Sequence, residues 1–140
     1  NAGDNEGWTP LHWAADRGCL GMTQMLLGEG ASVHSSNDDG CTPLHCSAAS
    51  GDVEVGQLLV GAGANVNAPD KREKTPLHWS ADGGHFEVSQ MLVGAGANVH
   101  AKDETGKIPI DLAKQPQLRG HGPSRGAVVA LLQQESDPLT

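Results

Sequence analysis

Three histidines are the first candidates for chemistry, because imidazole binds metal ions and transfers protons near neutral pH. His12, His45 and His78 are spaced 33 residues apart, and each occupies the same place in a segment that recurs along the chain. Equivalent residues of stacked helical units lie about 10 Å apart, the distance between packed helices. A zinc ion needs its ligand atoms within about 2 Å. The spacing therefore predicts separate structural histidines and no metal site.

Motifs for catalysis are missing from the sequence. It contains no glycine-rich phosphate loop between a strand and a helix, no HExxH pair, and no nucleophile in a recognisable elbow. Cys19, Cys41 and Cys46 are an odd number at no metal-ligand spacing, which favours a reducing compartment over a disulfide framework. We therefore expect a protein that is not an enzyme, holds no cofactor, and is intracellular, in the cytoplasm or the nucleus.

The three tryptophans are candidates for binding in a chain with no tyrosine and one phenylalanine. Trp8 and Trp13 lie in GWTPLHWAADRG at residues 7–18, and Trp79 lies in TPLHWSADGG at residues 75–84. Exposed tryptophan is a favoured anchor in protein interfaces. The elements that carry these rings decide whether they are exposed.

Those elements follow from a repeat of 33 residues. The motif TPLH begins at Thr9, Thr42 and Thr75, and the variant IPID begins at Ile108. A second motif, GxGAxV, follows each of the first three starts. We therefore expect a single domain over residues 1–140. It consists of repeats at 4–36, 37–69 and 70–102 and a diverged C-terminal capping repeat at 103–137.

The first half of each unit predicts a short helix. Thr9 is a suitable N-cap and Pro10 fits the first helical position, where its missing N–H costs nothing. One face of this helix is made of small and apolar residues, Leu11, Ala14, Ala15 and Gly18. That face predicts close packing against neighbouring units.

The second half of each unit predicts another helix, which in the first unit begins near Leu20 and ends at Gly28. We expect it to turn Met22, Met25 and Leu26 inward. Helices this short are unstable alone and cannot bury their apolar faces within one unit. Stacking solves both problems, so the sequence predicts an all-α solenoid with hairpin-like fingers projecting from one side.

Long motifs at this period resemble the ankyrin-repeat family. The matching segments are GWTPLHWAA at residues 7–15, GCTPLHCSA at 40–48 and LLVGAGANVN at 58–67. The resemblance covers about residues 4–113. It implies an ankyrin-repeat solenoid of helix-turn-helix units with β-hairpin-like fingers, and histidines that form structural hydrogen bonds to the fingers.

Several positions depart from the family pattern. Glu73 stands where the finger turn has glycine, so we expect a distorted third finger. In the last unit Asp111 replaces the histidine, Pro116 is expected to end the first helix early, and LRGHGPSRG carries an insertion before the outer helix. Residues after about Glu135 are expected to fray. The first two residues are in register with the end of a unit, which suggests a cut from a longer array.

The resemblance implies that one helix face and the fingertips line a concave groove for partners. In the first unit the face opposite the packed one carries Trp13, Asp16 and Arg17. We expect a partner segment to lie across Trp13, Cys46 and Trp79. The candidate partner-binding residues are Trp8, Trp13, Asp16, Arg17, Asp39, Cys41, Cys46, Arg72, Lys74, Trp79 and Asp82.

Charge narrows the class of partner. The formal net charge of −8 argues against binding to nucleic acid or an anionic membrane. It suits a basic partner, although many proteins are acidic for no such reason. The first two fingers are acidic and the third is basic. We expect a monomeric protein–protein interaction module whose tryptophans supply affinity and whose charges set the orientation of the partner.

Other interpretations stay open. The repeats could be the targeting or regulatory arm of a larger enzyme, since TPLHWAADRG also resembles the ankyrin portion of acyl-CoA-binding proteins. They could be a structural spacer, with Trp8 folded against Trp13 to shield the first repeat. Ankyrin domains that read histone tails resemble this chain at Trp8, Trp13 and Asp16. That resemblance implies a site for a lysine ammonium, although Cys46 stands where those readers place another aromatic residue.

Overall fold

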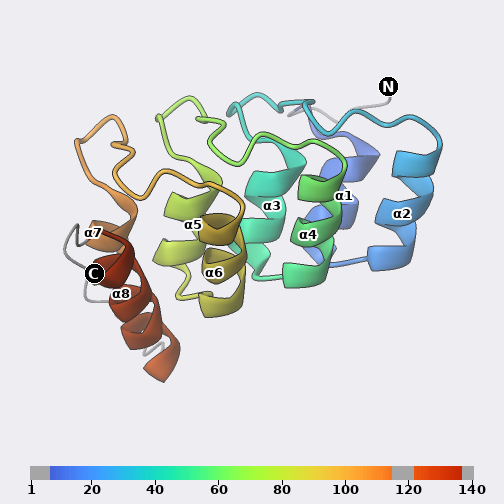
Figure 1. The fold of residues 1–140 in the computed structure, drawn as a ribbon. Coiled ribbons are helices and arrows are strands. Elements are labelled where there is room, and N and C mark those ends of the chain that lie inside the picture. Colours follow the sequence, from blue (N-terminus) through green and yellow to red (C-terminus); the bar gives the residue numbers. More distant parts are fainter. Residues whose placement is uncertain (1–6, 115–121, 137–140) are drawn as a thin grey trace.

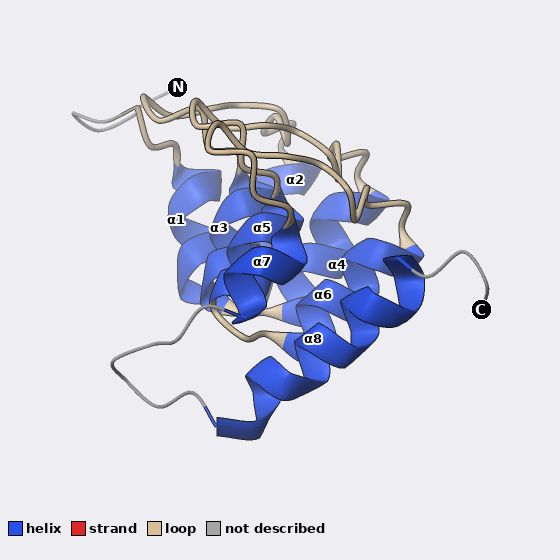
Figure 2. Cartoon of the chain, turned by 90° about the vertical axis from the view of Figure 1, so that its left-hand side faces the viewer, coloured by secondary structure: helices blue, strands red, loops and turns tan. Residues whose placement is uncertain are grey.

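Helices in two layers make up the computed structural model, which describes residues 7–114 and 122–136 (Figure 1). In these residues the helices are α1 (Pro10–Arg17), α2 (Leu20–Gly28), α3 (Pro43–Ser50), α4 (Val53–Gly61), α5 (Pro76–Asp82), α6 (Phe86–Gly94), α7 (Pro109–Lys114) and α8 (Gly122–Ser136). Figure 2 shows α1, α3, α5 and α7 in one layer, called inner below, and the even-numbered helices in the outer layer. The predicted all-α repeat solenoid is confirmed.

The inner helices begin where the sequence predicts. Thr9 caps α1 by accepting a hydrogen bond from the His12 N–H at 3.3 Å, and Pro10 occupies the first helical position. The His12 Nδ1 in turn accepts from the Thr9 N–H at 3.1 Å. The same reciprocal cap occurs at α3 and α5. Gly18, at φ 68°, ends α1 in the left-handed conformation that other residues rarely adopt.

The histidines also join each unit to the next. Because the Nδ1 of His12 accepts a hydrogen bond, its proton lies on Nε2, which donates to the Cys41 carbonyl at 2.7 Å. His45 and His78 make the same bond to the Lys74 and Lys107 carbonyls, at 3.0 and 2.9 Å. These contacts confirm that the three histidines are structural hydrogen-bonding groups.

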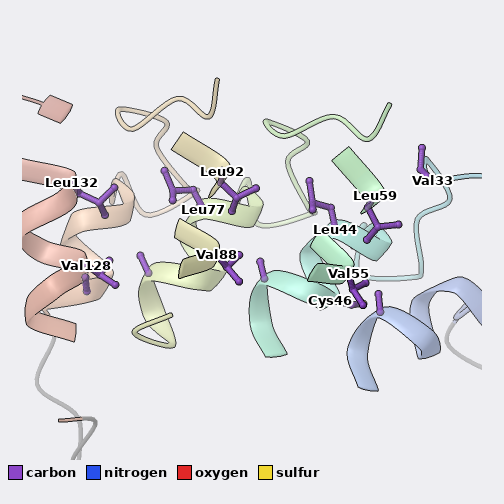
Figure 3. Packing of buried hydrophobic residues seen from close by; sticks show 14 of the residues in the cluster. Val33, Leu44, Cys46, Val55, Leu59, Leu77, Val88, Leu92, Val128 and Leu132 are labelled. Atoms are coloured by element: carbon purple, nitrogen blue, oxygen red, sulfur yellow. The ribbon is translucent and has the colours of Figure 1, made fainter. Parts of the chain in front are cut away.

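A continuous core runs between the layers (Figure 3). Leu44 and Leu77 enter it from inner helices, and Leu59 and Leu92 enter it from outer helices. All four are fully buried, and burial of a leucine side chain contributes about 1.5–3 kcal/mol. At the C-terminal end Leu132 of α8 continues the row.

The expected inward orientation of the α2 methionines is wrong. Met22 and Met25 are 48% and 50% exposed, whereas Val55, which aligns with Met22, is fully buried. Within the described residues α2 packs against one outer helix, α4, whereas α4 packs against both α2 and α6. The methionines are exposed because no described outer helix covers their side of α2. Thr23 is the buried residue of this helix, and its hydroxyl donates to the Cys19 carbonyl at 2.8 Å.

The fingers are turns rather than strand ladders in the described residues. They span residues 37–41, 70–74 and 103–107, and a backbone hydrogen bond of 2.8 to 3.0 Å closes each. Adjacent fingers are joined, since the Lys71 N–H donates to the Asp39 carbonyl at 3.0 Å and the Glu104 N–H donates to the Arg72 carbonyl at 2.8 Å. The fingers therefore form one ledge along the inner helices.

The third finger is not distorted, contrary to expectation. Glu73 takes the left-handed conformation, with φ 66°, that glycine takes in the neighbouring fingers. Its N–H donates to the Asp70 carbonyl at 2.9 Å, the same length as the equivalent bonds of Gly40 and Gly106. The turn keeps its shape because the residue, rather than the backbone path, bears the strain.

The last unit differs from the others in its outer helix. α8 begins at Gly122, inside the segment expected to be a loop insertion, so that expectation is wrong for residues 122–126. α8 packs against α6 and α7 at the end of the stack. Asp111 Oδ2 accepts from the Ile108 N–H at 3.0 Å and so replaces the capping role of the histidine. Pro116, the first six residues and the end after 136 lie outside the described residues.

Candidate partner-binding groove

A cavity of about 260 Å³ lies where the inner helices α1, α3 and α5 meet the second and third fingers. Its lining combines two tryptophans with charged and small residues: Trp8, Asp16, Asn37, Asp39, Cys41, His45, Cys46, Ala49, Asp70, Lys71, Arg72 and Trp79. We call it the tryptophan cavity. It brings together seven of the predicted site residues: Trp8, Asp16, Asp39, Cys41, Cys46, Arg72 and Trp79.

Trp8 forms one wall of the tryptophan cavity. Its ring lies against Trp13, with centroids 4.7 Å apart and an interplanar angle of 34°, and 5.7 Å from the His12 ring. Trp13 is 40% exposed and does not line the cavity, and the Arg17 guanidinium lies 5.5 Å from its ring centroid. The wall facing Trp79 is thus Trp8, where the sequence led us to expect Trp13.

Trp79 forms the second wall and is held in place by the finger beside it. Its Nε1–H donates to Asp70 Oδ2 at 3.1 Å. The other oxygen, Asp70 Oδ1, accepts from the Arg72 and Lys74 N–H groups at 2.8 and 2.9 Å. The Lys74 ammonium lies 5.4 Å from the Trp79 ring centroid. One buried carboxylate therefore fixes both the third finger and the indole.

Asp70 is the functional residue that our list of candidates missed. It shares a register of 33 residues with Asn37 and Asp103, and that register was the available signal. Asn37 Oδ1 and Asp103 Oδ1 accept from their own finger N–H groups in the same way. The register reveals a turn residue, but it does not reveal that the second oxygen of Asp70 reaches Trp79.

The floor of the cavity is uncharged. Cys46 is 5% exposed, less than a groove residue was expected to be, because α3 lies between α1 and α5. Burial, with Asp70 and Asp39 nearby, raises the pKa of the Cys41 thiol to about 11. Burial also raises the pKa of Cys46 far above its ordinary value. Both thiols are therefore protonated at neutral pH and are poor nucleophiles.

A second, more polar cavity of about 310 Å³ adjoins the first between the third and fourth fingers. Its lining includes Lys74 and Asp82, two further predicted site residues. Arg72 lines both cavities, so they are neighbouring parts of one groove. Trp13 and Arg17 are the predicted site residues that line neither cavity.

The stacked rings of Trp8 and Trp13 leave no space for a lysine ammonium between them. Centroids 4.7 Å apart place the two rings in mutual contact. A cation held by two aromatic rings needs access to the ring faces. The facing surfaces of these two rings are covered by each other, and the open side of Trp8 faces the tryptophan cavity.

Two further searches concern metal sites and membrane spans. Among the residues that the structure describes, no group of three or more His, Cys, Asp or Glu side chains could hold a metal ion. No helix in that part of the chain is both long and apolar enough to cross a membrane.

Comparison with known proteins identifies the repeats. A family model for ankyrin repeats, in three copies, matches residues 21–103, and a model for a single ankyrin repeat matches residues 6–35. A search of curated proteins found no match to the chain. Ankyrin repeats are in general non-catalytic modules for protein–protein interaction. With more than half of its length matched and four helix pairs stacked in two layers, the chain belongs to the ankyrin-repeat family.

Proposed function

We propose that this protein binds a partner protein by holding an extended segment of it in the groove between the inner helices and the fingers. The observation that carries the proposal is the tryptophan cavity, an aromatic-walled hollow of about 260 Å³ on the face where units meet. Tryptophan is a favoured anchor in interfaces, and such hollows in an exposed face mark contact sites.

The walls of the groove are ordered before any partner arrives. The Asp70 carboxylate holds Trp79, and Trp13 and His12 support Trp8. Side chains that are already fixed lose little conformational freedom on binding, so more of the contact energy becomes affinity. This preorganisation supports a binding role over a purely structural one.

The dimensions of the groove favour an extended segment. Three inner helices about 10 Å apart span roughly 20 Å, which an extended peptide covers with about six residues. Adjacent fingers are linked through the Lys71–Asp39 and Glu104–Arg72 backbone hydrogen bonds, so the ledge is continuous over that length. The net charge of −8 disfavours nucleic acid as the occupant, since phosphate binding depends on basic residues.

Site-specific photocrosslinking tests the proposal. A photoreactive amino acid is placed either at Ala49, which lines the tryptophan cavity, or at Gln57, which is exposed on the outer helix α4. Both proteins are irradiated in extract of the source cells, and the adducts are identified by mass spectrometry. We expect a defined protein adduct from Ala49 and none of it from Gln57. The same adducts from both positions, or none from Ala49, would refute the proposal.

A further inference from the structure

We infer that the tryptophan cavity receives one apolar side chain of the bound segment, flanked by a basic residue facing Asp16 and Asp39 and an acidic residue facing Arg72. The inference rests on the proposed function and specifies the chemistry of the occupant. It is carried by the floor of the cavity, the state of its two indoles, and the distribution of charge around its mouth.

The floor favours an apolar group over a cation. Cys41 and Cys46 present neutral thiols, and Ala49 presents a methyl group. The buried carboxylate in the lining, Asp70, already accepts hydrogen bonds from Arg72, Lys74 and Trp79. An ammonium or guanidinium that entered would lose its hydration and gain no unengaged acceptor at the floor, which is unfavourable.

The two indoles are already engaged in ways that disfavour a second cation. Lys74 Nζ lies 5.4 Å from the Trp79 ring centroid, so a cation added beside that ring would meet a like charge. One face of Trp8 is covered by Trp13. Lys71 and Arg72 also line the cavity and add repulsion. The indole surface that remains is suited to apolar contact.

The size of the cavity matches one side chain. Pockets for drug-sized ligands and cofactors are about 300–1,000 Å³. A cavity of about 260 Å³ is below that range. It accommodates a leucine, methionine or phenylalanine side chain while the backbone of the segment runs along the finger ledge.

Charge around the mouth gives the occupant a direction. Asp16 and Asp39, from α1 and the second finger, are exposed at the N-terminal side of the cavity. Arg72 is exposed on the third finger and lines both cavities, so its guanidinium can pair with a carboxylate between them. Complementary charges then set the orientation of the segment on the groove.

The test uses a phage-displayed library of random 12-residue peptides selected against the whole chain. Peptides enriched on the wild-type protein are synthesised, and their binding is followed through tryptophan fluorescence and calorimetry. Ala49→Trp fills the cavity from an exposed helix position, and Gln57→Trp is the matched control on the outer layer. We expect Ala49→Trp to weaken binding roughly tenfold or more and Gln57→Trp to leave it unchanged.

Charge reversal tests the flanking residues. Arg72→Glu is expected to weaken the selected peptide severalfold, and replacing the acidic residue of the peptide by lysine should restore the loss. The Asp16→Lys and Asp39→Lys double variant should respond in the same way to an acidic residue at the basic position of the peptide.

The possible outcomes separate the inference from the proposed function. Peptides that are sensitive to Ala49→Trp but place lysine or arginine at the position essential for binding would overturn the apolar occupant and leave groove binding intact. Charge reversals without rescue would overturn the assigned direction. Peptides insensitive to Ala49→Trp, or no enriched peptide at all, would contradict both the inference and the proposed function.

Discussion

At the scale of single residues, one side chain often serves both the fold and the groove. Asp70 closes the third finger with one oxygen and positions Trp79 with the other. The equivalent Asn37 closes the second finger with its side-chain oxygen alone. The finger turn therefore needs one oxygen, and the carboxylate of Asp70 supplies the second one to the groove.

Replacing Asp70 by asparagine separates these two roles. Asp70→Asn keeps an oxygen for the finger turn, as Asn37 shows, but puts an NH₂ group opposite the Trp79 Nε1–H. We expect the free energy of unfolding to fall by about 1–2 kcal/mol. In ¹H–¹⁵N spectra the indole resonance of Trp79 should shift while the finger amides keep their positions. Asp70→Ala, which removes both oxygens, should destabilise the protein more. Equal losses from the two variants would contradict this division of roles.

Glu73 offers a test of backbone strain. It holds the left-handed conformation, φ 66°, at a position where the second and fourth fingers have glycine. A residue with a Cβ pays about 1–2 kcal/mol for this conformation. Glu73→Gly is therefore expected to raise the free energy of unfolding by about 1 kcal/mol in urea titrations. Gly106→Ala, the reverse change in the fourth finger, should lower it, and opposite signs would contradict the assignment.

At the scale of elements, local signals in the sequence predicted the helix starts and stops, and contacts between units decided the rest. Thr-Pro pairs and terminal glycines act within one unit, so α1, α3 and α5 begin where predicted. Met22 has the same apolar character as Val55, but its burial depends on a neighbouring helix that is not encoded in its own unit. The sequence likewise could not distinguish Trp8 from Trp13 as the cavity wall, because the ring orientation of Trp8 is set by packing.

The histidines between units predict a dependence of stability on pH. Burial lowers the pKa of His45 and of His78 below the ordinary value of 6.5. The unfolded chain therefore takes up protons near pH 6.5, whereas the folded histidines do so only at lower pH. The stabilisation is present above pH 6.5 and is lost as the pH falls below it. Urea titrations at pH 7.5 and 5.5 should show a lower free energy of unfolding at pH 5.5.

A matched variant attributes that dependence to the two histidines. The His45→Gln and His78→Gln double variant removes the titrating groups, so its stability should change less between pH 7.5 and 5.5 than that of the wild type. A pH dependence of the same size in both proteins would show that other groups cause it.

At the scale of the whole molecule, stability and binding share one stack. Each inner helix contacts its neighbours in sequence, α1 with α3, α3 with α5 and α5 with α7. In such an array, stability is approximately a sum of unit terms and nearest-neighbour interface terms. The tryptophan cavity is lined by residues of α1, α3 and α5. It is therefore complete only when the first three units are stacked.

Leucine-to-alanine changes along the stack test this dependence on position. Leu11 of α1 and Leu44 of α3 align in register and are almost fully buried, so each change should cost about 2–5 kcal/mol locally. α1 contacts one inner helix, α3, in the described residues, whereas α3 contacts both α1 and α5. Amide hydrogen exchange should therefore show Leu11→Ala loosening α1 and α2 while α5 and α6 stay protected. Leu44→Ala should accelerate exchange on both sides of α3. Uniform acceleration by both variants would instead mean that the array unfolds as one cooperative unit, and the groove would then form or vanish with the entire chain.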